Sequence, residues 1–541
     1  MSESDGERSP LLSGTPTPTL HDSDEDSYNP RDPRASVSWL IPAVVMATFC
    51  NALTTFSRHV FFREFVCEEI GGLPDMPDPS LLQIDAVGFS RLDCSSPPYL
   101  SGTLTINVAS MIATSVFSAF STGWWSRLGD MHGRRYPLMT SVLGSILLNL
   151  VFVLIASSPA LEGLVQPCIF LALLLEGFLG GSATFYAAVH AYTADVAPAG
   201  SWSTLFSLLQ GLVILLSIMG NWIGFGADIL RPFLSFSLAS AIGVVNLAFV
   251  FFFLPESLPE ESQLDRPLKV AFKDIKKSIY STVTVFLTGH RLVFFGLAFF
   301  FYSLTSSLES FQLLFAFRRD PTTAPLTPGL FLMISPLTKM VTFLIVFPAM
   351  LHFFKRRSPL SFATSTKQYF FSVMTIDGSA ARYLVSANLV SQLLIIVFPT
   401  SLSAMFFLLA LMTPLSAGIK PAMYALSAVY SEVLGGAPRR GALFGAISVL
   451  GTVGETISHL MYVSTYNIFW RAFAKAGFML TAALLALVAI FLWPSEPERI
   501  PRDSAERIRI VVPDEGVTQD PSTFSPVYRR HGVAGHPADG H

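Results

Sequence analysis

Charged residues are scarce in this sequence of 541 residues. Asp, Glu, Lys and Arg make up 13% of it and apolar residues 51%, whereas a soluble domain usually carries about 25% charged residues. The mean hydropathy is +0.53, and so much apolar surface must be removed from water. The composition therefore indicates a membrane protein. The net charge of −3 gives no support to a nucleic acid or another polyanion as partner.

Cysteine is also sparse, with four residues in the chain. The sequence contains no C-x-x-C pair, no cluster of histidines and no glycine-rich phosphate loop. We therefore expect no metal site, no nucleotide site and no cofactor, and we do not expect an enzyme. Cys50 and Cys168 fall within apolar stretches, where cysteine behaves as a small apolar side chain.

Apolar windows of about 20 residues, the length of a helix that crosses a bilayer, recur along the chain. They predict an all-α membrane protein with about twelve transmembrane helices in two six-helix halves. The predicted spans are 38–57, 99–122, 136–157, 167–193, 203–227, 232–254, 292–316, 327–354, 380–400, 402–430, 441–466 and 471–493. The predicted domains are a disordered tail over 1–37, halves over 38–254 and 292–493, a linker over 255–291 and a second disordered tail over 494–541.

Lys and Arg are unevenly distributed over the predicted loops. With the N-terminus in the cytosol, 25 of the 35 basic residues lie on the cytosolic side and 8 on the opposite side. Loops rich in Lys and Arg stay in the cytosol, so both termini are predicted to be cytosolic. The linker contains a basic amphipathic stretch around Lys269–Lys277. It is typical of a helix on anionic membrane lipid, and a helix that binds a partner protein is the alternative.

The turn between the second and third predicted spans interrupts the apolar composition. Its charged residues and its glycine are Arg127, Asp130, Gly133, Arg134 and Arg135. The pattern D-x-x-G-R-R resembles the signature loop of the major facilitator superfamily, G-x-x-x-D-[RK]-x-G-R-[RK], although Ser126 replaces the first glycine and Met131 the first basic residue. The resemblance implies a transporter in which Asp130 faces the N-terminus of the span that begins near Gly441. These charges would then form a clasp that closes the cytosolic side.

Other segments extend this resemblance along the chain. Gly180–Pro198 is similar to the end of the fourth helix of the superfamily, LPESLPEE at Leu254–Glu261 to the exit of the sixth helix in fungal members, and Asp377 and Arg382 lie where the second half would repeat the clasp. Cys67 and Cys94 flank the first outer loop. Their placement resembles a pattern in fungal relatives of the proton-coupled folate and haem carriers and of tetracycline-resistance-like pumps. The resemblance implies a disulfide between these two cysteines, which the oxidising environment outside the cytosol permits.

Ionisable residues inside the predicted spans are candidates for function, because a charge in hydrocarbon is costly. They are Glu176, His190, Glu309, Lys339, Lys420 and Glu455. Glu176 stands where proton-coupled relatives carry an arginine, and it is the first candidate for a proton site, with a structural ion pair as the alternative. Lys420 with Glu455, and Lys339 with Glu309, either pair with each other or bind substrate, and the sequence leaves both readings open.

The N-terminal tail is acidic and rich in Ser and Pro. Within it, ERSPLL resembles an acidic dileucine sorting motif, with Glu7 as the acid and Leu11 and Leu12 as the leucine pair. This motif predicts a sorting adaptor as partner. It favours a vacuolar, lysosomal or endosomal membrane over the plasma membrane.

Together these features predict a secondary active transporter of a small organic solute that is coupled to protons and works by alternating access. Two lysines within the second half favour an organic anion symporter. Gly220–Gly226 lacks the proline of drug/proton antiporters, which makes an exporter of drugs or metabolites the alternative. A ligand sensor that has the fold of a transporter, but does not transport, is a further alternative.

Overall fold

The structure is a computed structural model. It describes residues 35–71, 82–84, 90–92, 97–158, 163–258, 286, 290–319, 326–357, 366–398, 411–433, 440–469 and 473–493. All of these belong to one compact unit, Met1–Glu496, and the second unit, Pro497–His541, lies outside the described residues. The predicted sorting motif and the amphipathic stretch of the linker also lie outside the described residues.

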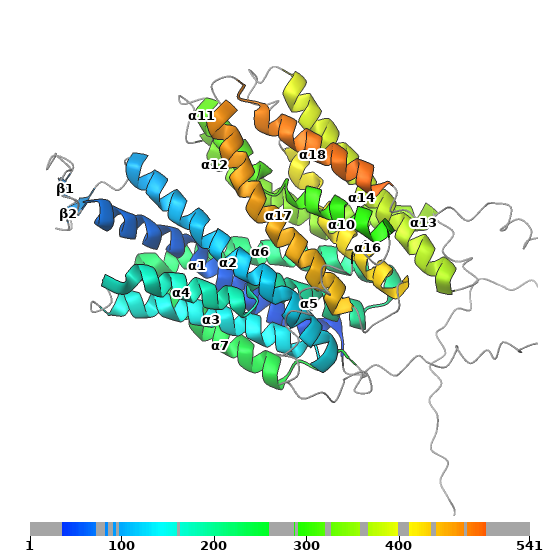
Figure 1. Ribbon diagram of the computed structural model, residues 1–541, viewed down its shortest axis with the longest axis horizontal. Coiled ribbons are helices and arrows are strands. Elements are labelled where there is room, and N and C mark those ends of the chain that lie inside the picture. Colours follow the sequence, from blue (N-terminus) through cyan, green and yellow to red (C-terminus); the bar gives the residue numbers. More distant parts are fainter. Residues whose placement is uncertain are drawn as a thin grey trace, which may run out of the picture. The chain divides into compact units, whose positions relative to one another are not determined.

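The first half of the chain forms a bundle of helices (Figure 1). Its helices are α1 (Val37–Gly71), α2 (Pro97–His132), α3 (Arg135–Ser157), α4 (Val165–Phe178), α5 (Gly181–Val196), the short η3 (Ala199–Ser201), α6 (Trp202–Leu230) and α7 (Leu234–Phe252). Between α1 and α2, strands β1 (Leu82–Ile84) and β2 (Ser90–Leu92) pair antiparallel, with Leu82 opposite Leu92. This hairpin is a small addition to the predicted all-α fold.

The second half contains shorter helical pieces as well as long helices. They are α10 (His290–Ser303), α11 (Leu308–Arg319), α12 (Leu326–Val341), the π-helix η5 (Thr342–Val346), α13 (Phe347–Arg357), α14 (Thr366–Val397), α16 (Ile419–Val433), α17 (Arg440–Phe469) and α18 (Ala476–Leu492). Several of these pieces join end to end, so that α10 with α11, and α12 with η5 and α13, each make one crossing.

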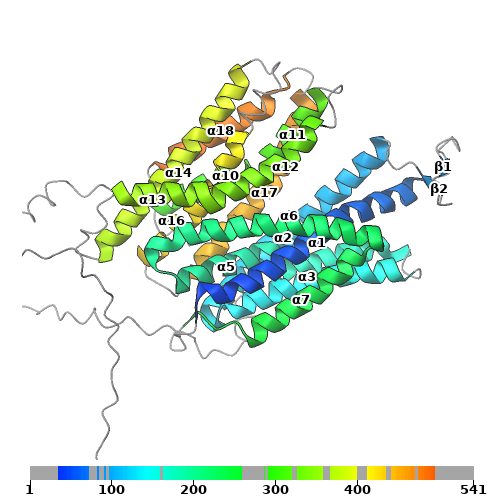
Figure 2. The ribbon, with the colours of Figure 1, turned by 180° about the vertical axis from the view of Figure 1, so that it is seen from behind.

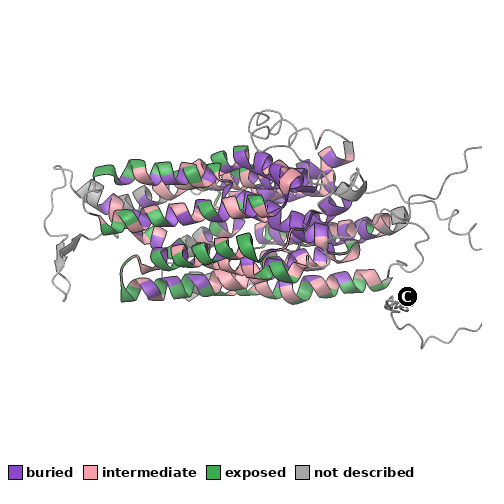
Figure 3. Ribbon diagram, turned by 90° about the horizontal axis from the view of Figure 1, so that it is seen from below, coloured by how far each residue is buried: buried purple, intermediate pink, exposed green. Residues whose placement is uncertain are grey.

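Ten helical segments among the described residues are long and apolar enough to cross a membrane. Apolar side chains also point outward, as at Phe170 and Ile490, which are 54% and 62% exposed. Buried residues gather in the right-hand part of the helices in the view of Figure 3. Outer faces of this kind suit lipid rather than water. The prediction of an all-α, multi-pass membrane protein is confirmed.

The helices extend beyond several predicted spans. The first span was predicted to end near residue 57, but α1 continues to Gly71. Arg58 does not end the helix because its side chain turns into the bundle, where Nη2 donates to Oδ1 of Asn149 at 3.3 Å. Likewise α14 begins at Thr366, well before the predicted start at 380.

The fourth crossing is broken between α4 and α5. Gly180 and Gly181 adopt φ values of +105° and +52°, a region that favours glycine. The break frees backbone carbonyls that lipid could not satisfy. Two hydroxyls of α2 bind them, since Ser118 Oγ donates to the carbonyl of Gly180 and Ser121 Oγ to that of Gly177, both at 2.7 Å.

The two halves pack against each other through a few helices. α17 of the second half lies on α2 and α5 of the first, and α6 of the first half lies beside α12 and α16 of the second (Figure 2). The largest buried cluster is shared by both halves and includes Phe206 of α6, Tyr424 of α16 and Phe444 of α17. This shared core fixes the geometry of the functional site.

Candidate functional site

Asp130, in the last turn of α2, binds the beginning of α17. Its Oδ1 accepts a hydrogen bond from the amide of Gly441 at 2.8 Å and its Oδ2 one from the amide of Ala442 at 2.7 Å. The first amides of a helix have no partner within the helix and favour a negative charge. Any Cβ at position 441 would lie 2.6 Å from Oδ1 of Asp130. Glycine at this position therefore allows the two halves to approach.

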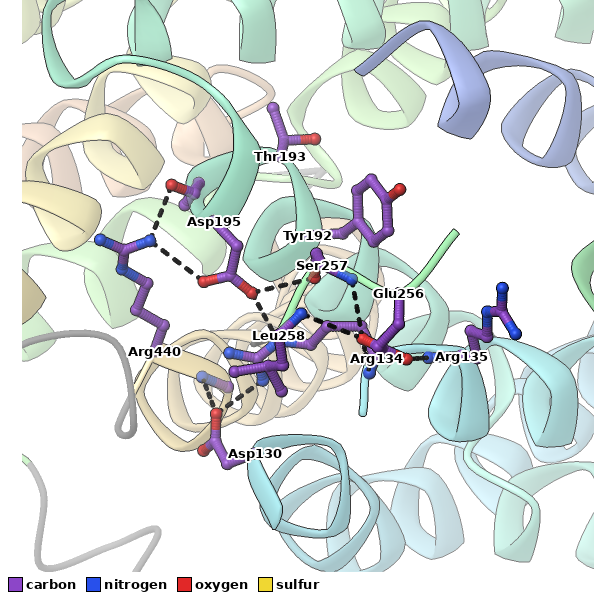
Figure 4. A network of polar contacts seen from close by, with 12 residues as sticks. Asp130, Arg134, Arg135, Tyr192, Thr193, Asp195, Glu256, Ser257, Leu258 and Arg440 are labelled. Carbon is purple, nitrogen blue, oxygen red and sulfur yellow. Dashed lines mark hydrogen bonds and ion pairs between the residues drawn. The ribbon is translucent and has the colours of Figure 1, made fainter. Parts of the chain in front are cut away.

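Arg134 connects Asp130 to a second carboxylate. Its side chain is 1% exposed; Nη1 lies 2.6 Å from Asp130 and Nε lies 2.8 Å from Asp195, in the last turn of α5 (Figure 4). Burial alone would lower the pKa of the guanidinium, but the carboxylates of Asp195 and Asp130 outweigh it and hold the pKa above its usual value. Arg134 therefore remains charged.

Asp195 is shared by one arginine from each half. Besides Arg134, it binds Arg440, the first residue of α17, whose Nη1 lies 3.1 Å from Oδ1 of Asp195. The same Nη1 donates to the carbonyl of Ala194 at 2.8 Å. The guanidinium of Arg440 also lies 5.9 Å from the ring centre of Trp202, a geometry that adds a cation–π attraction. Arg440 thus forms a second ionic link between the halves.

Glu256, just after α7, holds the turn between α2 and α3 in place. Its carboxylate accepts the backbone amide of Arg134 at 2.7 Å and that of Arg135 at 3.3 Å (Figure 4). It also accepts the amides of Ser257 and Leu258 that follow it, at 2.9 and 3.4 Å. Gly133 turns the chain with φ +113°. A Cβ at that position would collide with the carboxylate of Glu256.

The structure brings together most residues of the predicted clasp. Asp130 and Arg134 take part through their side chains, whereas Arg135 takes part through its backbone amide and Gly133 through its turn. Among the described residues, Arg127 forms no hydrogen bond or ion pair.

Sequence reasoning assigned no role to three further members of this network, Asp195, Glu256 and Arg440. Asp195 and Glu256 stand in motifs that were recognised as similar to the superfamily, so the motifs offered a signal. No sequence signal marked Arg440, because its role depends on the approach of α17 to α5.

Further polar contacts link the halves beside this clasp. The donor and acceptor pairs are Ser203 Oγ with Asp377 Oδ1 at 2.5 Å, Lys355 Nζ with the Gly200 carbonyl at 2.5 Å, Ser207 Oγ with the Phe343 carbonyl at 2.7 Å and Ser448 Oγ with the Ala183 carbonyl at 2.7 Å. Asp377 therefore faces the first turn of α6, as Asp130 faces that of α17. Arg382 does not join it, because its guanidinium lies 5.4 Å from the ring centre of Trp493.

A cavity of about 230 Å³ lies between α6 and the helices of the second half. It is lined by Gln210, Ile214, Tyr302, Ser303, Thr305, Ser306, Leu308, Glu309, Lys339, Phe343, Asn388, Thr413, Ser416, Ala417, Lys420 and Glu455. Most of these residues are polar. Such a lining is typical of a site for a small polar molecule.

Irregular helical segments border this cavity. Thr305 and Ser306 lie in the break between α10 and α11, Ser416 and Ala417 precede α16, and Phe343 lies in the π-helix η5. Irregular backbone at membrane depth is tolerated where it lines a cavity, and π-helical turns are frequent at functional sites. The irregular backbone thus coincides with the polar lining.

Two ion pairs lie on the wall of the cavity. Lys339 Nζ is 2.6 Å from Glu309 Oε2, and Lys420 Nζ is 2.8 Å from Glu455 Oε1. The sequence left open whether these residues pair, and in the structure they do. Their side chains are 28–42% exposed, so the pairs are partly solvated, and pairs of this kind stabilise by only about 0–1 kcal/mol. A ligand can therefore replace one partner at low cost.

An aromatic cluster packs between the two halves. The ring of His190 stacks on that of Tyr424, with centroids 4.0 Å apart, and packs against Phe206 and Phe444. His190 and Phe206 come from the first half and the other two from the second. Nδ1 of His190 lies 2.6 Å from the carbonyl of Tyr186, while Nε2 is buried and has no partner among the described residues. His190 therefore packs in the interface between the two halves and does not line the central cavity.

The remaining predicted site residues lie elsewhere. Glu176 does not line the large cavity; it borders a second one of about 30 Å³ inside the first half. Cys67 takes part in a disulfide, and Cys94 lies outside the described residues. Glu7, Leu11 and Leu12 also lie outside the described residues.

Comparison with known proteins places this arrangement among transporters. The sequence profile of the Major Facilitator Superfamily matches residues 84–366. Among curated proteins, no sequence matches the chain significantly. Three solved structures resemble the chain at sequence identities of 12–17%, and at such low identity the resemblance shows a shared fold and nothing more.

Each of these structures covers 85% of the chain. The human organic anion transporter MFSD10 (TETRAN) has a TM-score of 0.59 at 17% identity, with 99% of its own chain covered. The proton:xylose symporter XylE has a TM-score of 0.56 at 12% identity, with 96% of its own chain covered. A bacterial homologue of the iron transporter ferroportin, in an outward-facing state, has a TM-score of 0.54 at 13% identity, with 98% of its own chain covered. With the profile match over more than half of its residues, the chain belongs to the major facilitator superfamily.

Proposed function

We propose that this protein is a secondary active transporter that carries a small organic anion together with protons by alternating access. The observation that carries this proposal is the pair of partly exposed lysine–glutamate contacts on the wall of the central cavity. The cavity has room for a small solute, and its lining offers two ammonium groups. The description of one structural neighbour as an organic anion transporter supports the same substrate class.

The charges of the cavity provide a route to proton coupling. As long as Glu455 is ionised, it neutralises Lys420 at 2.8 Å, and an anion gains little from that lysine. Protonation of Glu455 removes the competing charge, so that the ammonium of Lys420 can bind a carboxylate or a similar anion. The same argument applies to Lys339 and Glu309. An anion then enters together with a proton, because each stabilises the binding of the other.

The clasp provides the conformational part of the proposal. Asp130, Arg134, Asp195 and Arg440 join the two halves at one end of the bundle. The excess of Lys and Arg in the loops predicted at this end supports a cytosolic location for it. In this reading the structure is the state that is closed toward the cytosol, and transport requires the clasp and the aromatic cluster to separate.

Transport can be measured directly in proteoliposomes that contain a trapped pH dye. A panel of organic anions, organic cations and neutral metabolites is added outside, in vesicles with parent protein, with Lys420→Gln or without protein. The expected result is acidification with organic anions but not with the other solutes, seen with the parent and weaker with Lys420→Gln at the same anion concentration.

Other results would replace this proposal. A response to organic cations, with protons moving in the opposite direction, would indicate a drug or metabolite exporter. Binding of a labelled ligand without flux would indicate a sensor. Labelled uptake without a change of pH would indicate a facilitator, in which the glutamates serve only as partners of the lysines.

A further inference from the structure

The second cavity, of about 30 Å³, lies inside the first half between α1, α3, α4, α5 and α7, and it shares no residue with the central cavity. Its volume is close to that of a single water molecule or small ion. Much of its lining is polar although it lies within an apolar bundle. The polar side chains that the argument uses are Asn51, Ser141, Ser145, Glu176 and Asn246.

The two serines of α3 present lone pairs rather than hydrogens to this cavity. Ser141 Oγ donates its hydrogen to the carbonyl of Pro137 at 2.8 Å, and Ser145 Oγ donates to Oδ1 of Asn51 at 3.2 Å. A hydroxyl has a single hydrogen to donate. With that hydrogen used elsewhere, each oxygen can act toward the cavity only as an acceptor.

Asn246 of α7 presents an acceptor too. Its side chain is fully buried, and Nδ2 donates to the carbonyl of Ala43 at 3.2 Å. Because a carbonyl can only accept, this contact fixes which end of the amide is nitrogen. The remaining atom, Oδ1, is buried and has no partner among the described residues. A buried acceptor without a donor is costly, so this oxygen points to a ligand of positive charge or with a hydrogen to donate.

Glu176 adds the negative charge. Within the described part of the chain its carboxylate forms no hydrogen bond and has no cation within ion-pair distance. The cation that acts on it is Arg58 of α1, whose Nη2 is engaged by Asn149. The other titratable groups on the wall are Tyr186 and Cys50, whose Sγ donates to the carbonyl of Ala239 at 3.3 Å. Thus one carboxylate and several acceptor oxygens line this small cavity.

We propose that this cavity is a binding site for Na⁺. Hard cations take oxygen ligands, and the lining supplies a carboxylate, amide oxygens and hydroxyl oxygens. The site holds one carboxylate, and the guanidinium of Arg58 already offsets part of its charge, so a monovalent ion is favoured over a divalent one. A proton on Glu176 is the competing occupant, because the protonated carboxyl has a hydrogen to donate to Oδ1 of Asn246, and the measurements below distinguish the two ions. The exposed side chains of Asn51 and Ser182 give access from outside the bundle.

This inference goes beyond the proposed function, since binding needs neither substrate nor transport. Binding of ²²Na⁺ is measured on the purified full-length protein in detergent at alkaline pH, with choline as the replacement cation. The variants are Asn246→Leu, which keeps the shape and removes the oxygen, and Glu176→Gln. The matched control is Asn107→Leu, because Asn107 of the same half donates to the carbonyl of Thr103 and does not border the cavity.

The parent and Asn107→Leu should bind ²²Na⁺ saturably. Unlabelled Na⁺ should displace the bound ²²Na⁺, and choline should not. Both cavity variants should bind at least about tenfold more weakly, from the loss of one charged or acceptor ligand. Thermal unfolding of the parent in Na⁺ and in choline gives a readout that needs no variant to fold, and Na⁺ should raise its Tm. Absence of saturable binding by the parent would overturn the site, as would an unchanged affinity of Asn246→Leu. A Tm of the parent that rises at acidic pH but does not rise with Na⁺ would show that Glu176 holds a proton instead.

Discussion

Asp130→Asn should open the clasp. The substitution keeps the size of the side chain and one carbonyl oxygen, but it removes the charge and one of the two acceptors for the amides of Gly441 and Ala442. Arg134 keeps its second carboxylate, Asp195, so no buried cation is left alone. The effect therefore falls on the contact between α2 and α17 rather than on the folding of either half.

The magnitude follows from these contacts. A hydrogen bond to a charged group contributes about 1.5–3 kcal/mol, and a carboxylate at a partly buried helix N-terminus up to about 2 kcal/mol. With one neutral bond retained, the closed arrangement should lose about 2–4 kcal/mol. Since every 1.4 kcal/mol is tenfold, the ratio of closed to open molecules should fall by roughly 30- to 1,000-fold.

Distances between two spin labels can report this change. Tyr136 of α3 and Phe353 of α13 are exposed by 41% and 49% and belong to different halves, and labels there suit a parent in which Cys50 and Cys168 are replaced by Ala. Asp130→Asn should shift the distance distribution to longer values. Ser121→Ala is the control, because Ser121 of the same helix bonds to Gly177 within the first half. Equal distributions for Asp130→Asn and the control would refute the reasoning.

Three further variants follow from the same geometry. Gly441→Ala should lengthen the same distances, because its Cβ would press on Asp130. Arg440→Gln should also lengthen these distances, because the closed arrangement loses about 1.5–3 kcal/mol from the contact with Asp195. Arg127→Ala should change the free-energy difference between closed and open molecules by no more than about 0.5 kcal/mol, since Arg127 bonds to no described residue. For transport, Lys420→Gln should raise the KM for the anion about tenfold, the equivalent of about 1.4 kcal/mol, and a KM equal to that of the parent would remove the lysine from the site.

Much of the fold could be predicted from local sequence. Apolar windows reveal membrane helices whatever their neighbours are, and the pattern around Asp130 and Gly133 is short enough to recognise without a structure. The ends of helices were less predictable. α1 runs past Arg58 because that side chain is turned inward to Asn149, and hydropathy treats an inward and an outward arginine alike.

Contacts that depend on packing between distant helices could not be read from the sequence. Arg440 reaches Asp195 only because α17 packs on α5. The lysines of the second half were equally ambiguous, since a lysine within a span can pair or bind substrate, and the choice depends on distances. Glu176 also required the structure, because its separation from the central cavity is not visible along the chain.

The two sets of ion pairs differ in burial, and burial suits each set to a different task. Asp130, Arg134 and Asp195 are at most 5% exposed at their side chains, so parting them costs several kcal/mol unless water or new partners replace the lost contacts. Such a network favours one arrangement of the halves strongly. The pairs at Lys339 and Lys420 are about one-third exposed, and solvent lowers the cost of exchanging a partner. A transporter needs both, because its gate must hold until it is released and its binding site must give up each ligand it takes.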